Sequence, residues 1–242
     1  MLRHCHDLIV PQEWAVITGS RWYRCYGPGE ELGRLFMQAL GTGQARIVAM
    51  LLDHGIPLGV IQSPSALRYG LRCHNWFKNP GSFELLQVMV AHGADVNERN
   101  KKGTLLHQHI YSAEQDATTI QLLLALGADT EALDYNGYKP LRVAVNAMRT
   151  NRRVESYNKD ILEALLAAGA DMINSGALHY AAIIGRYEAL EAMICAGADP
   201  STVYVGPVPL KKGVPLGKTV REYHQEYRER LSSGLAWSLV VS

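Results

Sequence analysis

The 242-residue chain lacks the features that mark membrane-spanning, disulfide-rich and nucleic-acid-binding proteins. It has no run of about 18 apolar residues, so the sequence predicts no helix that spans a membrane. Its four cysteines are scattered, without the spacing of a metal site or the density of a disulfide framework. The formal net charge is only +1, which provides no basic field for binding nucleic acid. We therefore expect no metal, no cofactor, no membrane and no nucleic-acid partner.

The N-terminal region also lacks the pattern of a secretion signal. Its apolar stretch, residues 8–17, is interrupted by Pro11, Gln12 and Glu13, and no small-residue cleavage pattern follows. Scattered cysteines favour a reducing compartment, so we expect a cytoplasmic or nuclear protein. Residues 1–30 show no repeat, and we interpret them as a non-repeat N-terminal cap.

Recognisable catalytic motifs are absent as well. The sequence has no Gly-x-Ser-x-Gly elbow, no His-Glu-x-x-His pair and no paired carboxylates at a known spacing. The motifs therefore favour a protein that is not an enzyme, although a fold can carry many functions.

The chain does contain five apolar segments of equal length that superimpose without gaps. Each has apolar residues at helical spacing and ends on glycine, the residue that most easily adopts the left-handed conformation at a helix end. We therefore predict five helices, each of which stops at its glycine. The segments are Ile47–Gly55, Leu85–Gly93, Thr119–Gly127, Ile161–Gly169 and Ala189–Gly197.

A second column of short segments lies upstream of the first. Its second member is always large and apolar, and its fifth is small in four of five cases, which allows a neighbouring helix to approach closely. Each unit is therefore predicted to be two short antiparallel helices joined by a turn. The segments are Leu35–Leu40, Ala66–Leu71, Leu105–Ile110, Pro140–Val145 and Ala177–Ala182.

These units resemble ankyrin repeats, which read roughly Asp-x-x-Gly-x-Thr-Pro-Leu-His-x-Ala-Ala, followed by a helix ending Leu-Leu-x-x-Gly-Ala-Asp. The similarity is closest at Asp134–Leu141 and at Ala177–Asp199, and it covers about residues 31–232. The resemblance implies an all-α ankyrin-repeat solenoid of about five to six helix-turn-helix units with short β-hairpin fingers. Residues 31–217 would form this array, and residues 218–242 a C-terminal capping helix and tail.

In this family the resemblance implies binding of a partner protein through a concave groove formed by the finger tips and the first helices. Tyrosine, asparagine and basic side chains exposed together are typical of protein-binding surfaces. Tyr138 fits packing within its finger equally well. Carried over by position, the candidate contacts are Lys101, Lys102, Tyr111, Asp134, Tyr135, Asn136, Tyr138 and Asn146.

A rival hypothesis is an enzyme or small-molecule-binding protein with a pocket around His107, His109 and Arg142. His107 occupies the histidine position of the first helix, where the resemblance implies a bond to the backbone of the neighbouring hairpin. Arg142 stands in the same column, where it would bridge carbonyls or a nearby acid such as Asp129 or Asp134; anion binding is the alternative. His109 stands where the other units have alanine or glycine, so it must find room and a partner. A deep cleft there would favour the enzyme or small-molecule-binding hypothesis.

An adaptor for a ubiquitin ligase is a third hypothesis, although no adaptor box is recognisable.

Overall fold

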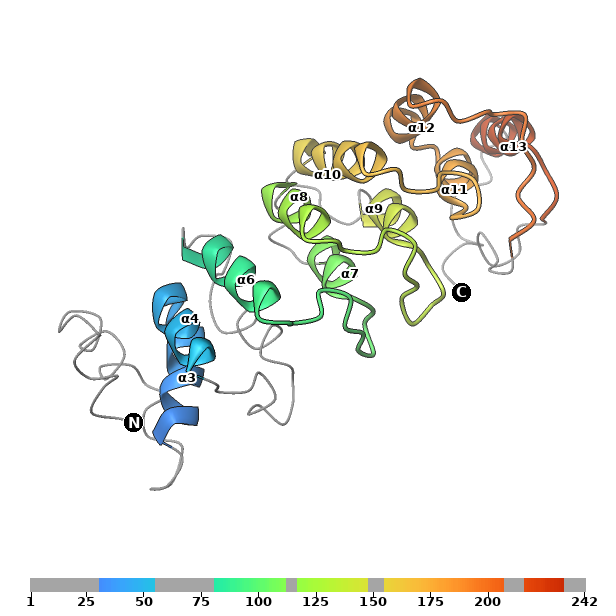
Figure 1. Cartoon of the computed structure of the whole chain (residues 1–242). Helices are drawn as coiled ribbons and strands as arrows, with labels where there is room; N and C mark the ends of the chain where they lie inside the picture. The colour runs from blue at the N-terminus through green and yellow to red at the C-terminus, as the bar shows by residue number, and fades with distance from the viewer. Residues whose placement is uncertain (1–30, 55–80, 112–116, 148–154, 207–215, 233–242) are drawn as a thin grey trace. The chain divides into compact units, whose positions relative to one another are not determined.

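The computed structural model of the chain describes residues 31–54, 81–111, 117–147, 155–206 and 216–232. These residues contain ten α-helices joined by turns and loops (Figure 1). None of the ten has the length and apolar character needed to cross a membrane. The chain divides into two compact units, Met1–Val96 and Asn97–Ser242.

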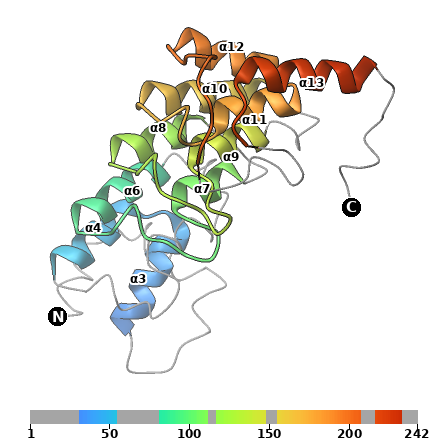
Figure 2. The ribbon, with the colours of Figure 1, turned by 90° about the vertical axis from the view of Figure 1, so that its right-hand side faces the viewer.

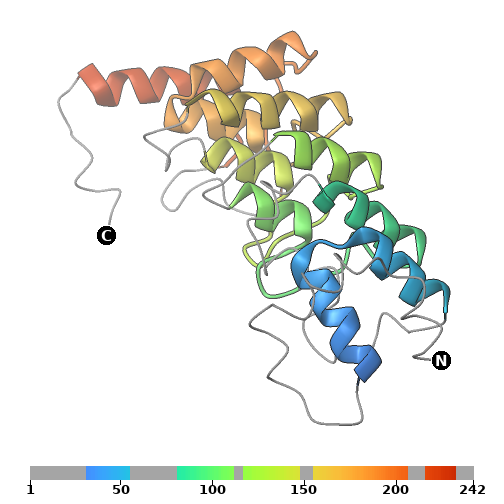
Figure 3. The ribbon, with the colours of Figure 1, turned by 90° about the vertical axis from the view of Figure 1, so that its left-hand side faces the viewer.

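The first unit contains three described helices, α3 (Glu31–Thr42), α4 (Ala45–Asp53) and α6 (Gly81–Ala91) (Figure 3). Helix α3 packs against α4, and α4 packs against α6. The ring Nε2 of His92 lies 2.9 Å from Asp53 Oδ1 and joins the C-terminal ends of α4 and α6. The first unit thus contains one complete helix pair and the second helix of the next repeat.

The second unit forms two layers of helices (Figures 1 and 2). Within one layer, α7 packs against α9, α9 against α11 and α11 against α13; within the other, α8 packs against α10 and α10 against α12. The first layer consists of α7 (Leu105–Ile110), α9 (Pro140–Ala147), α11 (Ala177–Ile184) and α13 (Val220–Ser232). The second consists of α8 (Ala117–Ala125), α10 (Glu155–Ala167) and α12 (Tyr187–Cys195).

The core forms where the sequence predicts it. The large apolar members of the first-helix column, Leu106, Leu141 and Leu178, are fully buried. Ala144 and Ala181, the small members, are also buried between neighbouring helices of the layer. Burial of these stripes drives the stacking, because a single helix pair cannot cover its own apolar face.

The predicted helix stops are confirmed at the four glycines that lie in described residues. Each has a positive φ, which other residues reach only at a cost of about 1–2 kcal/mol. The angles are 91° at Gly93, 88° at Gly127, 80° at Gly169 and 99° at Gly197. The fifth predicted stop, Gly55, lies outside the described residues.

The fingers are tight turns rather than extended ladders. Within the described residues, antiparallel pairing is limited to isolated bridges, Asn100 with Gly103 and Val203 with Thr219. Helix α13 closes the first-helix layer: its Tyr223 is buried, and the ring of Tyr227 lies where a side chain at Gly185 would be. The predicted Ala66–Leu71 helix, the N-terminal cap and the C-terminal tail lie outside the described residues.

Candidate functional site

The first finger of the second unit ends in a four-residue turn. The backbones of Asn100 and Gly103 exchange two hydrogen bonds, each 3.1 Å long. The side chain of Asn100 accepts a further bond of 2.6 Å from the Lys102 N–H. Lys101 and Lys102 occupy the two central positions of this turn, and both are exposed. The turn therefore projects two lysine side chains from a backbone that is held in place by its own hydrogen bonds.

The second finger is organised around the carboxylate of Asp134, which is only 5% exposed. Its Oδ1 accepts hydrogen bonds from the N–H groups of Asn136 and Tyr138, each 2.8 Å long. The backbone of the same residue pairs with Tyr138 at 2.9 Å. Asp134 therefore shapes the finger from inside, and it presents Tyr135 and Asn136 at the tip, where both are exposed.

Tyr111 joins the end of α7 to this second finger. Its hydroxyl donates a 2.8 Å hydrogen bond to Asp134 Oδ2, while 41% of the residue stays exposed. Partial burial raises the pKa of the Tyr111 hydroxyl, and the bond to the Asp134 carboxylate raises it further. Part of Tyr111 is thus open to a partner, but its hydroxyl is already used within the protein.

Two further side chains connect the first finger to the elements that follow it. The guanidinium of Arg99 donates to the Leu133 carbonyl oxygen in the second finger. The amide of Asn97 donates to the Gly127 carbonyl at 2.9 Å and accepts from the Asp129 N–H at 2.7 Å. The two fingers are therefore linked at several points, and such linkage favours a preorganised surface.

His107 fixes the second finger onto α7. Its Nε2 donates to the Tyr138 carbonyl at 3.0 Å, a direction assigned because Nδ1 accepts from the backbone and hydroxyl of Thr104. The ring is fully buried, and burial lowers its pKa. Both nitrogens of this neutral ring are engaged, so His107 has the structural role that the resemblance implies.

Arg142 takes the position of His107 in the next first helix. It is 2% exposed, and its guanidinium carbon lies 4.2 Å from the ring centre of Tyr138 and 5.0 Å from that of Tyr180. Burial lowers the pKa of Arg142, although an arginine side chain remains protonated at ordinary pH. Tyr138 therefore packs over a buried cation, and Asn146 accepts a 2.8 Å bond from the Tyr180 hydroxyl.

The three residues of the rival pocket are all buried. His109 is 5% exposed in α7, and His107 and Arg142 are covered more completely. A substrate would have to displace neighbouring side chains to reach any of them. Within the described ranges, no group of three or more histidine, cysteine, aspartate or glutamate side chains is arranged to hold a metal ion.

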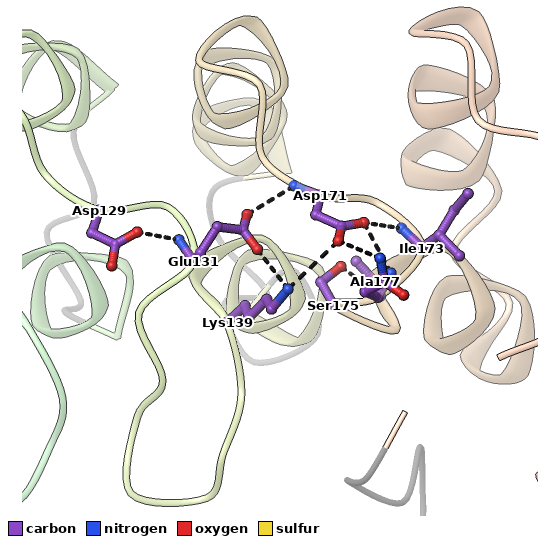
Figure 4. A network of polar contacts seen from close by, with 8 residues as sticks. Asp129, Glu131, Lys139, Asp171, Ile173, Ser175 and Ala177 are labelled. Atoms are coloured by element: carbon purple, nitrogen blue, oxygen red, sulfur yellow. Dashed lines mark hydrogen bonds and ion pairs between the residues drawn. The ribbon is translucent and has the colours of Figure 1, made fainter. Parts of the chain in front are cut away.

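A polar network connects the bases of consecutive fingers (Figure 4). The Lys139 ammonium lies 2.5 Å from Glu131 Oε2 and 3.6 Å from Asp171 Oδ2. Burial lowers the pKa of Lys139, but the bond to Glu131 and both carboxylate charges outweigh that effect, so the pKa is raised. Glu131 also accepts a 3.0 Å bond from the Asp171 N–H. Glu131 and Asp171 are therefore already paired with a cation of the same chain, Lys139.

The predicted contact residues thus separate into two groups. Asp134, Tyr138 and Asn146 hold the fingers and helices together. The other five are exposed, and together with Leu133 they form what we call the finger surface: Lys101, Lys102, Tyr111, Leu133, Tyr135 and Asn136. Sequence reasoning missed Leu133, which is 41% exposed; its place beside the finger tip, two residues before Tyr135, was the available signal.

Curated proteins that resemble this chain carry ankyrin repeats. This chain is 30% identical over 144 residues to the human ankyrin repeat and SOCS box protein 6. The matched region covers 59% of this chain and 32% of that protein. The chain is 33% identical over 105 residues to the ankyrin repeat, SAM and basic leucine zipper domain-containing protein 1 of Eulemur macaco macaco, covering 42% of this chain and 21% of that protein. The chain thus spans a third or less of these relatives' length.

A solved structure agrees with them on the fold. It is an ankyrin repeat domain from Acinetobacter baumannii, 22% identical, with a TM-score of 0.52, and the match covers 68% of this chain and 82% of the other. No family model matches the chain. The paired helices, the left-handed glycines that end them, the fingers and these similarities lead to one conclusion: the chain is an ankyrin-repeat protein.

Proposed function

We propose that the chain binds a partner protein through the finger surface. Ankyrin repeats in general mediate protein interactions, and the repeats here support that role at the level of a general interaction module. The finer proposal names the surface: the tips of the two fingers and the adjoining end of α7.

Tyr135 is the observation that carries this proposal. It is 69% exposed, although its own finger is held rigidly by Asp134, and no hydrogen bond within the described residues involves its hydroxyl. An exposed aromatic residue on a rigid turn offers a large contact area at a small cost in conformational entropy. Leu133 and Asn136 are exposed in the same finger, and the two lysines are exposed on the neighbouring finger, so the surface combines apolar and polar groups as protein interfaces commonly do.

Site-specific photo-crosslinking tests the proposal. Replacing Tyr135 with benzoylphenylalanine should give covalent products with a partner protein in extracts of cells that express the chain. The matched control carries the same group at Glu163, an exposed residue of α10 in the second-helix layer. Equal products from both positions, or products from position 163 alone, would place the interface elsewhere.

A double substitution measures how much the surface contributes. Tyr135→Ala with Asn136→Ala should weaken capture of the crosslinked partner by about tenfold or more, because central aromatic contacts often carry about 2 kcal/mol. Both residues are exposed, so the melting temperature should stay within a few degrees of the original. A large loss of stability would show that these residues support the finger instead of contacting a partner.

The rival pocket receives no support from a specific observation, because its three side chains are buried.

The compartment in which binding takes place also forms part of the proposal: the scattered cysteines favour the cytoplasm or the nucleus. Fluorescence imaging of a tagged chain would decide this, and secretion into the medium would contradict it.

A further inference from the structure

The tip of the first finger carries positive charge that pairs with no acidic side chain in the part of the chain that the structure describes. Lys101 and Lys102 stand side by side in the exposed turn, and neither forms an ion pair with another described residue. Arg99, two residues before Lys101, adds a third cation while its guanidinium holds the Leu133 carbonyl. The acid nearest to them in sequence is Glu98, which is half-buried.

Negative charge on the neighbouring finger is already used inside the protein. Glu131 and Asp171 share the ammonium of Lys139 at the base of the fingers (Figure 4). Asp134 lies buried beneath the tip and accepts hydrogen bonds from its own finger and from Tyr111. The acidic groups therefore lie at the bases of the fingers or inside them, whereas the exposed tip of the first finger is basic.

An apolar contact area adjoins this basic tip. Leu133 and Tyr135 are exposed on the second finger, and the bond from Arg99 to the Leu133 carbonyl ties this part of the second finger to the first. A ligand that matches both halves needs carboxylates for the lysines and an apolar side chain for Leu133 and Tyr135. Charge complementarity of this kind mainly provides specificity and speeds association.

We infer that the partner presents an acidic segment to the finger surface, in which carboxylates contact Lys101 and Lys102 and a nearby apolar residue covers Leu133 and Tyr135. This inference rests on the proposed function and adds the chemistry of the partner to it. A peptide is favoured over nucleic acid because the chain as a whole has a net charge of only +1. A leucine beside the tyrosine also suits an apolar side chain better than a phosphate or a base.

Fluorescence anisotropy with three synthetic peptides of about twelve residues tests the inference. In the first, glutamates flank a central pair of phenylalanine and leucine; the second has glutamine and the third lysine in place of every glutamate. The original protein should bind the acidic peptide about tenfold more tightly than the glutamine peptide at about 50 mM salt. This preference should shrink as salt is added, because exposed charges are screened.

A charge reversal provides the sharper comparison. Lys101→Glu with Lys102→Glu should abolish the preference for the acidic peptide and create one for the lysine peptide. The control, Arg221→Glu with Arg228→Glu on exposed positions of α13, changes the net charge equally and should bind like the original protein. Circular dichroism of both variants should match the original, since all four positions are exposed.

Each remaining outcome overturns the inference. Equal binding of the acidic and glutamine peptides, no binding of the acidic peptide, or an equal loss in the α13 control would show that the lysines do not select carboxylates. Binding of an oligothymidine probe in preference to the acidic peptide would identify a nucleic-acid surface. Under the first three of these outcomes, the proposed function would still stand if benzoylphenylalanine at position 135 captures a protein.

Discussion

Two kinds of junction occur between the repeats of the second unit, and they differ at one position of the first helix. His107 donates to the Tyr138 carbonyl at 3.0 Å, and His179 lies 2.9 Å from the Thr202 carbonyl, so both rings contact the finger of the next repeat. Arg142 occupies the same position in the helix between them, with its guanidinium over the rings of Tyr138 and Tyr180.

We relate this difference to the length of the following finger. After His107, the next finger has its full length, and Pro140 stands thirteen positions after Gly127. After Arg142, Ala177 stands only eight positions after Gly169. A shorter finger covers less of the first helix, so a longer side chain is suited to the space beneath it. Arginine also provides a planar cation that stacks on aromatic rings. A neutral imidazole carries no charge for such a contact.

The largest effect is expected at the arginine junction. Arg142→Ala should destabilise the fold by about 2–4 kcal/mol, because it removes a buried side chain and leaves a cavity between two rings. Urea denaturation followed by circular dichroism measures this change. Arg221→Ala, at an exposed position of α13, is the control and should change the stability by less than about 0.5 kcal/mol. A cost below about 1 kcal/mol at Arg142 would show that the rings do not depend on it.

Substitutions of His107, in the junction between α7 and the second finger, are expected to cost less stability. His107→Ala should destabilise by about 1–3 kcal/mol, because it removes a fully buried ring and leaves the Tyr138 carbonyl with only the Asp134 N–H as donor. His107→Arg should not restore the stability, because the full-length finger leaves no room for the longer side chain. If His107→Arg is as stable as the original protein in urea, finger length is not what selects the residue.

The two junctions should also differ in their response to pH. Burial lowers the pKa of His107 and of His179 below the ordinary value near 6.5. Their contribution to stability is therefore complete above pH 6.5 and is lost as the pH falls through the folded-state pKa, whereas Arg142 stays charged throughout.

Urea midpoints measured between about pH 7.5 and pH 5 should therefore fall in the original protein. The fall should be smaller in His107→Gln, which keeps a donor but cannot titrate. The same slope in both proteins would assign the acid sensitivity to other groups.

The smallest effect is expected at the bond between α7 and the second finger. Tyr111→Phe removes the 2.8 Å hydrogen bond to Asp134 but keeps the ring, so the cost should be about 0.5–1.5 kcal/mol. Asp134 retains the N–H groups of Asn136 and Tyr138, which limits the loss. Thermal melts detect this shift, and a larger one would make Tyr111 a support of the finger.

The repeats could be predicted from the sequence because their signals are local. Apolar residues at helical spacing identified α8, α10 and α12, and the glycine after each marked the stop that its positive φ confirms. The resemblance to ankyrin repeats likewise implied the bond of His107 to the next finger, because His107 stands at the histidine position of that repeat.

The division of the candidate contacts could not be predicted in this way. Asp134 and Tyr135 are neighbours in one finger, yet one is buried and the other is 69% exposed. Which of them faces solvent depends on the turn that the finger adopts and on α7 beneath it. Leu133 was missed for the same reason, since an apolar residue in a loop is as easily buried as exposed.

By itself, the sequence determined the two helical columns, the glycine stops and the ankyrin-repeat architecture, because spacing and left-handed glycine act within a single repeat. Only the tertiary structure decided that Arg142 lies between two rings, that Asp134 is enclosed, and that Arg99 reaches the Leu133 carbonyl of the second finger. Two of these contacts join residues more than 30 positions apart across repeat boundaries, Arg142 with Tyr180 and Arg99 with Leu133. They depend on how far each finger reaches over its neighbour, which no local pattern of residues specifies.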